Sequence, residues 1–219
     1  REAGEAIVDD HRVALVSATG SVPMGRAVGQ RVAARFGRSL LELGGNNAAI
    51  LRPSADLDLA LRGVAFAAMG TAGQRCTTLR RLFVDAGVYD AFVPRLKAAY
   101  ASVRVGDPRD DDTLVGPLID EAAAAAMDRA LDAARACGGI VTGGERVDRA
   151  GVYVRPALVE MPAHTGPMLD ETFAPVLYVL KIASLEEAIA LNNAVPQGLS
   201  SAIFTFSTFC GCCTICIRV

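Results

Sequence analysis

A strand–helix–strand pattern near the start of the chain restricts the fold more than any other feature. Residues 13–17 form a short apolar run typical of a buried strand, and a turn, a helix to about Phe36 and a second strand at 40–43 follow. Two neighbouring strands that are joined through a helix run parallel, because the connection returns the chain to the same edge of the sheet. Residues 13–43 therefore predict one β-α-β unit, and with it an α/β fold.

The rest of the chain alternates in the same way. We expect strands at 47–51, 79–85, 152–161, 173–182 and 199–205, and helices at 57–69, 121–137 and 185–192. Asp56 is the predicted N-cap of the first of these helices, and Ser184 with Glu187 forms a capping box for the last. We also expect a helix that is capped by Asp90 and runs to about residue 103.

The composition is that of a globular protein without an unusual charge. The chain has 219 residues, 52% of them hydrophobic and 21% charged, with a formal net charge of −2. This charge predicts no nucleic-acid partner, and no apolar run reaches the ~18 residues that a membrane span needs. The two histidines stand far from each other and from any cysteine pair, so we expect no metal site.

The cysteines are concentrated at the end of the chain. Four of the six lie at positions 210, 212, 213 and 216. No second pair completes a zinc site around Cys213 and Cys216, so residues 206–219 are interpreted as a non-homologous, cysteine-rich tail. The low cysteine content of the remaining chain predicts a reduced, cytoplasmic protein.

Cys76 is the candidate nucleophile. It follows a glycine-containing loop, Gly70-Thr71-Ala72-Gly73, at the end of a predicted helix, and it stands between Arg75 and the hydroxyls of Thr77 and Thr78. A neighbouring cation and free backbone N–H groups favour the thiolate, which is the reactive form. On this local pattern alone, a buried structural cysteine is an equally good interpretation.

Glu42 decides between these two interpretations. It ends a predicted strand in the run Glu42-Leu43-Gly44-Gly45, and a carboxylate that returns near a thiolate supplies a base to activate water. Together with Gly73-Gln74-Arg75-Cys76 and Glu171-Thr172-Phe173-Ala174-Pro175, this motif resembles the aldehyde dehydrogenase superfamily from about residue 4 to residue 205.

The resemblance implies a fold in two parts and a cofactor. Residues 1–43 would be the C-terminal part of a Rossmann-like NAD-binding domain with a parallel sheet, and residues 44–205 most of an α/β catalytic domain. NAD is the expected cofactor, with NADP left open. The residues that the resemblance places at the cofactor are Gly4, Gly20, Ser21, Leu43, Glu171 and Phe173. It also implies an internal fragment of a longer, homo-oligomeric enzyme, so the activity of the isolated chain stays open.

The implied reaction oxidises an aldehyde to a carboxylic acid. Cys76 would form a thiohemiacetal and then a thioester, which water activated by Glu42 hydrolyses. The sequence around Cys76 is most similar to the α-aminoadipic semialdehyde (antiquitin-like) branch, in which a cation beside the nucleophile suits a substrate with a distal carboxylate. Arg75 and Thr77 are therefore the candidate substrate-binding residues. Alternatively, Arg75 only tunes the thiol or pairs with a surface acid.

Several alternatives remain at this point. Residues 20–25 approach the phosphate-loop pattern, but Arg26 and Ala27 replace its lysine and hydroxyl. The aspartates of 105–117 lack the glycine and glutamate of a calcium loop, which favours a solvated turn. An inactive fragment or assembly module would use the same fold without its chemistry. A CoA-dependent acylating dehydrogenase would share Cys76, although Glu42 favours hydrolysis.

Overall fold

The computed structural model describes residues 2–206 and divides the chain between Gly44 and Gly45 into two compact units. Each unit is described by itself. The predicted tail at 206–219, with its four cysteines, lies outside the described residues except for Phe206. No helix within the described part of the chain is long and apolar enough to cross a membrane.

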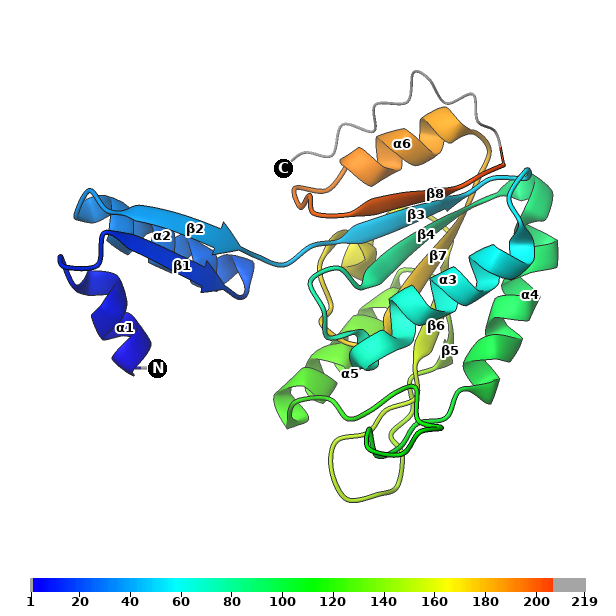
Figure 1. Cartoon of the computed structure of the whole chain (residues 1–219). Coiled ribbons are helices and arrows are strands. Elements are labelled where there is room, and N and C mark those ends of the chain that lie inside the picture. The colour runs from blue at the N-terminus through cyan, green and yellow to red at the C-terminus, as the bar shows by residue number, and fades with distance from the viewer. Residues whose placement is uncertain (1, 207–219) are drawn as a thin grey trace. The chain divides into compact units, whose positions relative to one another are not determined.

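The first unit is a β-α-β unit preceded by one helix (Figure 1). Its elements are α1 (Glu2–Asp9), β1 (Leu15–Thr19), α2 (Val22–Ala34) and β2 (Arg38–Glu42). β1 and β2 pair in parallel, with Leu15 opposite Arg38 and Thr19 opposite Glu42, as the sequence predicted.

Local signals explain where α2 begins and how α1 is attached to it. Ser21 is the N-cap, and its hydroxyl accepts a hydrogen bond of 3.3 Å from the Met24 N–H. The Arg31 guanidinium of α2 pairs with Asp9 at the end of α1. The apolar centre of this unit is small, comprising the buried side chains Val8, Val16 and Val32.

The second unit contains a six-stranded sheet in the order β5-β6-β7-β4-β3-β8 (Figure 1). Its strands are β3 (Asn47–Leu51), β4 (Leu79–Asp85), β5 (Ile140–Gly143), β6 (Ala157–Met161), β7 (Val176–Ile182) and β8 (Ser201–Phe204). All neighbours pair in parallel except β5, which runs antiparallel to β6 at one edge. The central strands are buried on both faces, which is usual for a parallel sheet covered by helices.

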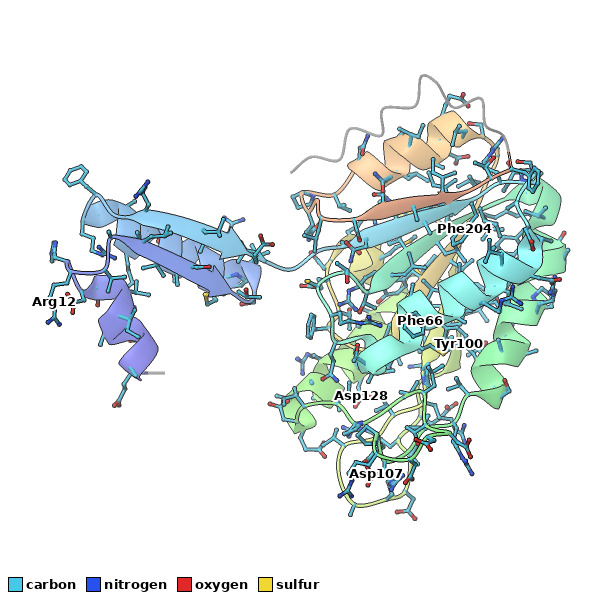
Figure 2. The ribbon with its side chains drawn as sticks, viewed as in Figure 1. Arg12, Phe66, Tyr100, Asp107, Asp128 and Phe204 are labelled. Carbon is cyan, nitrogen blue, oxygen red and sulfur yellow. The ribbon has the colours of Figure 1, made fainter. Side chains whose placement is uncertain are left out.

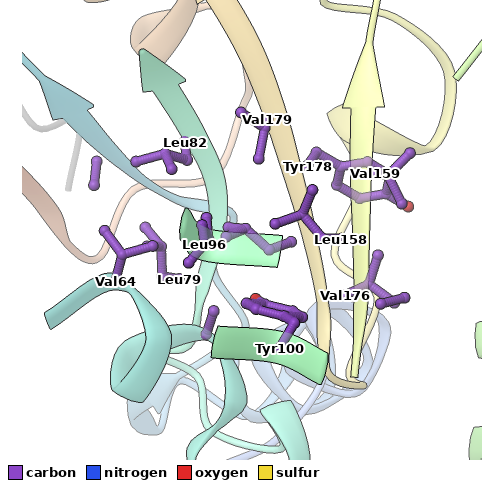
Figure 3. Close-up of a cluster of buried hydrophobic side chains, with 14 of the residues drawn as sticks. Val64, Leu79, Leu82, Leu96, Tyr100, Leu158, Val159, Val176, Tyr178 and Val179 are labelled. Atoms are coloured by element: carbon purple, nitrogen blue, oxygen red, sulfur yellow. The ribbon is translucent and has the colours of Figure 1, made fainter. Parts of the chain in front are cut away.

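Helices connect and cover these strands. They are α3 (Leu57–Met69), α4 (Ala86–Ser102), α5 (Glu121–Ala136) and α6 (Leu185–Asn193), with short 3₁₀ turns η1 (Gly70–Gly73) and η2 (Gly166–Leu169). α3 and α4 lie side by side over the sheet, and their apolar side chains meet those of β4, β6 and β7 in one core (Figures 1 and 3). In Figure 3, Val64 of α3 and Leu96 and Tyr100 of α4 contribute to this cluster.

Several predicted boundaries are confirmed. The strands at 47–51 and 79–85 and the helix at 57–69 have the predicted limits, and the Asp56 carboxylate caps that helix through the Asp58 and Leu59 N–H groups. Half of the predicted capping box is confirmed, because the Ser184 hydroxyl accepts from the Glu187 N–H; the Glu187 carboxylate accepts from the Ala183 N–H, one residue before the cap. Side chains that satisfy the first N–H groups of a helix leave a readable signal in the sequence.

Other predicted boundaries are wrong. The strands expected at 13–17 and 40–43 are displaced by about two residues, to Leu15–Thr19 and Arg38–Glu42. The cap of α4 is Asp85, whose carboxylate accepts from the Gly87 N–H, so the helix begins before Asp90. β6 and β7 begin only after Pro156 and Pro175, because proline has no N–H for the ladder. β8 is likewise shorter than predicted. The edge strand β5 was not predicted, because it is short and alternates weakly.

Candidate active site

Cys76 lies on an irregular turn that follows α3. Thr71 and Ala72 both have φ of +52°, and Gly73 has φ of +69°. Two successive non-glycine residues in the left-handed region are uncommon and store strain, a feature that clusters at functional sites. Beyond this turn the Cys76 side chain is exposed, so the interpretation as a buried packing cysteine is wrong.

Asn47 fixes the backbone around the nucleophile. Its buried side-chain amide donates to the Cys76 carbonyl at 2.7 Å and to the Thr78 carbonyl at 2.8 Å, and its oxygen accepts from the Ser200 N–H at 3.2 Å. Two of these bonds hold the Cys76 loop against the start of β3, and the third attaches the residue before β8 to the same side chain. No feature of the sequence predicted this role for Asn47, although it lies two residues after the motif 42–45.

The loop also packs tightly against the third motif. A Cβ at Gly73 would lie 2.2 Å from the Ala174 carbonyl oxygen and 2.5 Å from the Pro175 nitrogen. Only glycine permits such an approach of two backbones, and only glycine adopts the positive φ here at little cost. Residues 171–175 therefore lie beside the nucleophile loop, as expected if the motifs around Cys76 and Glu171 belong to one site.

Glu171 and Phe173 lie in this neighbouring segment. The Glu171 carboxylate accepts from the Gly45 N–H at 3.2 Å and from the Arg80 guanidinium at 3.4 Å. The Phe173 ring is 46% exposed and its centroid is 5.4 Å from the Arg80 guanidinium carbon. An exposed aromatic ring next to a carboxylate offers a surface for a flat polar ligand.

Arg75 does not form an ion pair within residues 2–206. Its guanidinium lies over the Phe66 ring of α3, 5.4 Å from the centroid, and its Nε is buried without a hydrogen-bond partner. Figure 2 labels Phe66 on α3. The alternative that Arg75 pairs with a surface acid is therefore not supported. Thr77, the residue after Cys76, is exposed to solvent.

The remaining candidates belong to the first unit. Gly20 and Ser21 connect β1 to α2, and Leu43 directly follows β2, so all three lie at the carboxyl ends of two parallel strands. The Gly20 N–H donates to the Glu42 carbonyl at 3.0 Å, which joins the two strand ends. This edge, where a helix begins, is the usual place of nucleotide sites in parallel sheets.

Leu43 explains why a glycine occupies position 25, in the first turn of α2. A Cβ at Gly25 would lie 2.5 Å from the Leu43 side chain, so Leu43 packs directly on the first turn of α2. The Glu42 side chain is exposed at the end of β2. Gly4 lies within α1, and a Cβ there would meet nothing within 4 Å.

The candidates thus fall into two groups. In the second unit the structure brings the Cys76 loop together with Glu171 and Phe173, and it leaves Arg75 against α3. In the first unit it brings together Gly20, Ser21, Leu43 and the backbone of Glu42. Among residues 2–206 there is no cluster of three metal-ligating side chains.

Comparison with known proteins identifies the family. The model of the aldehyde dehydrogenase family matches residues 1–209. The chain belongs to this family. The match covers residues 20–25, so this turn is part of the aldehyde dehydrogenase fold rather than of a phosphate-loop hydrolase.

Curated relatives share about half of the residues. The chain is 51% identical over 203 residues to aldehyde dehydrogenase family 7 member A1 of Pisum sativum, covering 92% of the chain and 40% of the relative. It is 50% identical over 204 residues to the α-aminoadipic semialdehyde dehydrogenase of Mus musculus, covering 92% of the chain and 38% of that protein. The chain thus spans about 40% of the length of the relatives it matches.

Solved structures share the fold at lower identity. An NAD-dependent aldehyde dehydrogenase from Sinorhizobium meliloti has a TM-score of 0.92 and 35% identity, covering 94% of this chain and 42% of that one. A betaine aldehyde dehydrogenase from Staphylococcus aureus, solved in complex with NAD⁺, has a TM-score of 0.90 and 29% identity, with 93% and 42% covered.

Proposed function

We propose that this chain is part of an enzyme that oxidises an aldehyde to a carboxylic acid with NAD(P). The observation that carries the proposal is the exposed Cys76 on a strained loop, fixed by Asn47 and packed against the Glu171–Phe173 segment. A nucleophile needs both access and a fixed orientation, and this loop supplies both. Family membership supports the same assignment.

Each unit, taken by itself, offers residues that fit part of a dinucleotide. Gly20, Ser21 and Leu43 gather at the start of α2, where a Cβ on Gly20 would meet only the flexible Met24 side chain. Glu171 would accept hydrogen bonds from a ribose, and the exposed Phe173 ring would contact the nicotinamide. Gly4 stays a weaker proposal, because it lies in the exposed helix α1. When bound, NAD supplies the hydride acceptor. The similar structures include an NAD-dependent aldehyde dehydrogenase and one solved in complex with NAD⁺, which supports NAD for this chain.

The residues of this chain carry the rest of the proposed reaction. The Cys76 thiolate attacks the aldehyde carbon to form a thiohemiacetal, whose oxyanion accepts a hydrogen bond from the Cys76 N–H. Loss of hydride from that carbon leaves a thioester on Cys76. Glu42 takes a proton from water, the hydroxide adds to the thioester carbon, and the acid leaves as the thiolate is restored.

We propose a semialdehyde with a distal carboxylate as the substrate. Arg75 holds a cation beside Cys76 that no carboxylate of residues 2–206 neutralises, and a charge-assisted bond to a substrate carboxylate would satisfy it. Thr77 offers a hydroxyl on the other side of Cys76. The relatives named α-aminoadipic semialdehyde dehydrogenase favour the same class of substrate. We further propose a cytoplasmic homo-oligomer with no nucleic-acid or membrane partner.

The test uses a chimera in which this chain replaces the matching segment of the pea relative. C76S should abolish NAD-dependent oxidation while NAD binding persists, because serine is a far weaker nucleophile in the same geometry. E42Q should give one rapid burst of NADH followed by very slow turnover, because the amide cannot take a proton from water.

Each outcome separates the alternatives. Sustained turnover by C76S would reject Cys76 as nucleophile, and an unchanged steady-state rate in E42Q would place the base elsewhere. Turnover that depends on added CoA rather than on Glu42 would favour the acylating dehydrogenase. Absence of NAD binding to the unsubstituted chimera would favour an inactive assembly module.

A further inference from the structure

Two consecutive arginines at the start of β4 are both almost completely buried. Arg80 and Arg81 are each 1% exposed. Because successive side chains of a strand point to opposite faces of the sheet, the two guanidinium groups bond different parts of the protein. Arg81 bonds the carbonyls of Asn46, Leu191 and Asn192. Arg80 instead reaches the nucleophile loop.

The Arg80 guanidinium connects the nucleophile loop to the Glu171 segment. Its Nη1 donates to the Gly73 carbonyl at 3.0 Å and to the Ala174 carbonyl at 3.2 Å. Its Nη2 donates to the Arg75 carbonyl at 3.2 Å and to the Glu171 carboxylate at 3.4 Å. One rigid group therefore bonds both backbones at the point where they approach most closely.

The connection extends to the first residue of the second unit. The same Glu171 oxygen that Arg80 bonds also accepts from the Gly45 N–H. Burial of a charge is costly unless it is paired, and Arg80 is paired with one carboxylate and three carbonyls. Burial lowers the pKa of Arg80, against the opposing effect of Glu171.

A planar fork suits this task better than a point charge. A guanidinium presents donors in fixed directions, so its two outer nitrogens can each bond two oxygens at once, whereas the single nitrogen of lysine cannot span them. The Arg75 guanidinium, which the sequence predicts to bind the substrate, lies over the Phe66 ring.

We propose that Arg80 is the positioning residue of the site, whose fork holds the 73–76 loop and the Glu171 segment at a fixed separation. This inference rests on the proposed function, in which Cys76 is the nucleophile and Glu171 contacts the cofactor. Arg80 itself does not touch the substrate. Its role is to keep the nucleophile and the cofactor contact aligned, where small displacements cost much of the rate.

The test compares R80M, R80K and the control R81M in the 219-residue chain, without cofactor or aldehyde. Hydrogen exchange is followed in peptides covering 71–78 and 171–175. R80M should speed exchange in both segments together, by roughly tenfold or more, because several bonds to a charged group are lost. R80K should fail to restore protection, since one nitrogen cannot bond both backbones. R81M should leave the exchange rates of both segments unchanged relative to those of the remaining amides.

A second readout follows the position of the Cys76 thiol. The rate of Cys76 alkylation by iodoacetamide is measured at one pH by peptide mass spectrometry, with the partly buried Cys137 as an internal reference. The rate for Cys76 should change in both R80M and R80K, because neither side chain holds the loop through all of the bonds that Arg80 makes. A purely structural defect would alter Cys137 as well.

The outcomes are decisive in each case. Unchanged exchange in R80M, or full protection in R80K, would overturn the proposal; if R80M does not fold, R80K alone decides it. Failure of the unsubstituted chimera to oxidise an aldehyde would count against the proposed function only, because neither readout here requires turnover.

Discussion

Substitution of Gly73 by alanine is expected to displace the nucleophile loop. The new Cβ would lie 2.2 Å from the Ala174 carbonyl oxygen and 2.3 Å from its carbon, so two backbones must separate. Gly73 also has φ of +69°, which costs an L-residue about 1–2 kcal/mol. Overpacking against a neighbour that cannot rotate away adds about 1–3 kcal/mol. The free energy of unfolding should therefore fall by about 2–5 kcal/mol in G73A.

Gly138 provides a matched control. It has φ of +82°, yet a Cβ there would lie 3.4 Å from the Pro162 side chain, an ordinary contact. G138A therefore carries the conformational cost without the collision, about 1–2 kcal/mol. The difference between the two variants isolates the approach of the loop to residues 174–175.

Urea denaturation of both variants measures this difference. G73A should lose about 1–3 kcal/mol more than G138A at an unchanged m-value, since the surface exposed on unfolding is the same. Cys76 alkylation should change in G73A and not in G138A, because only the first moves the loop. Equal losses in the two variants would refute the reasoning that close backbone contact holds this loop.

Three further changes test the site and its surroundings. N47A should lower the free energy of unfolding by about 2–4 kcal/mol and speed amide hydrogen exchange around Cys76, because it leaves buried carbonyls without their donor. N47D keeps the shape of the side chain but should recover little of this stability. An unchanged free energy of unfolding in N47A would contradict the bonds described. R75Q in the chimera should raise KM about 10–100-fold for a semialdehyde with a distal carboxylate and leave a neutral aldehyde of equal length unaffected; an equal rise for both would exclude carboxylate recognition. Burial and Arg81 lower the pKa of His164 to about 4, so the folded state resists protonation that the unfolded chain accepts below about 6.5. The free energy of unfolding should thus fall by about 2 kcal/mol as the pH drops from 6.5 to 4, a value reduced for the partial exposure of the ring. H164N should remove this pH dependence, which is measured by thermal unfolding at a series of acid pH values.

Local signals in the sequence predicted much of the architecture. The β-α-β unit, the strands at 47–51 and 79–85 and the helix caps at Asp56 and Ser184 depend on periodicity and on side chains within a few residues of each other. Such short-range determinants are readable without a structure. The motifs around Glu42, Cys76 and Glu171 likewise led to the family that the comparison identifies.

The tertiary structure alone decided how the site is held together. Asn47, Arg80 and Glu171 are distant in sequence, and only the parallel pairing of β3 and β4 and the path of the 171–175 segment bring their side chains to one loop. The same long-range packing explains why the nucleophile loop is bonded by the side chain of Arg80 rather than by that of Arg75, the sequence neighbour of Cys76. Arg80 projects from a buried strand toward the carbonyls of the nucleophile loop, whereas Arg75 lies on the turn and rests on Phe66 of α3. Adjacency in sequence identifies a residue near the nucleophile, but the direction of its side chain is set by the sheet.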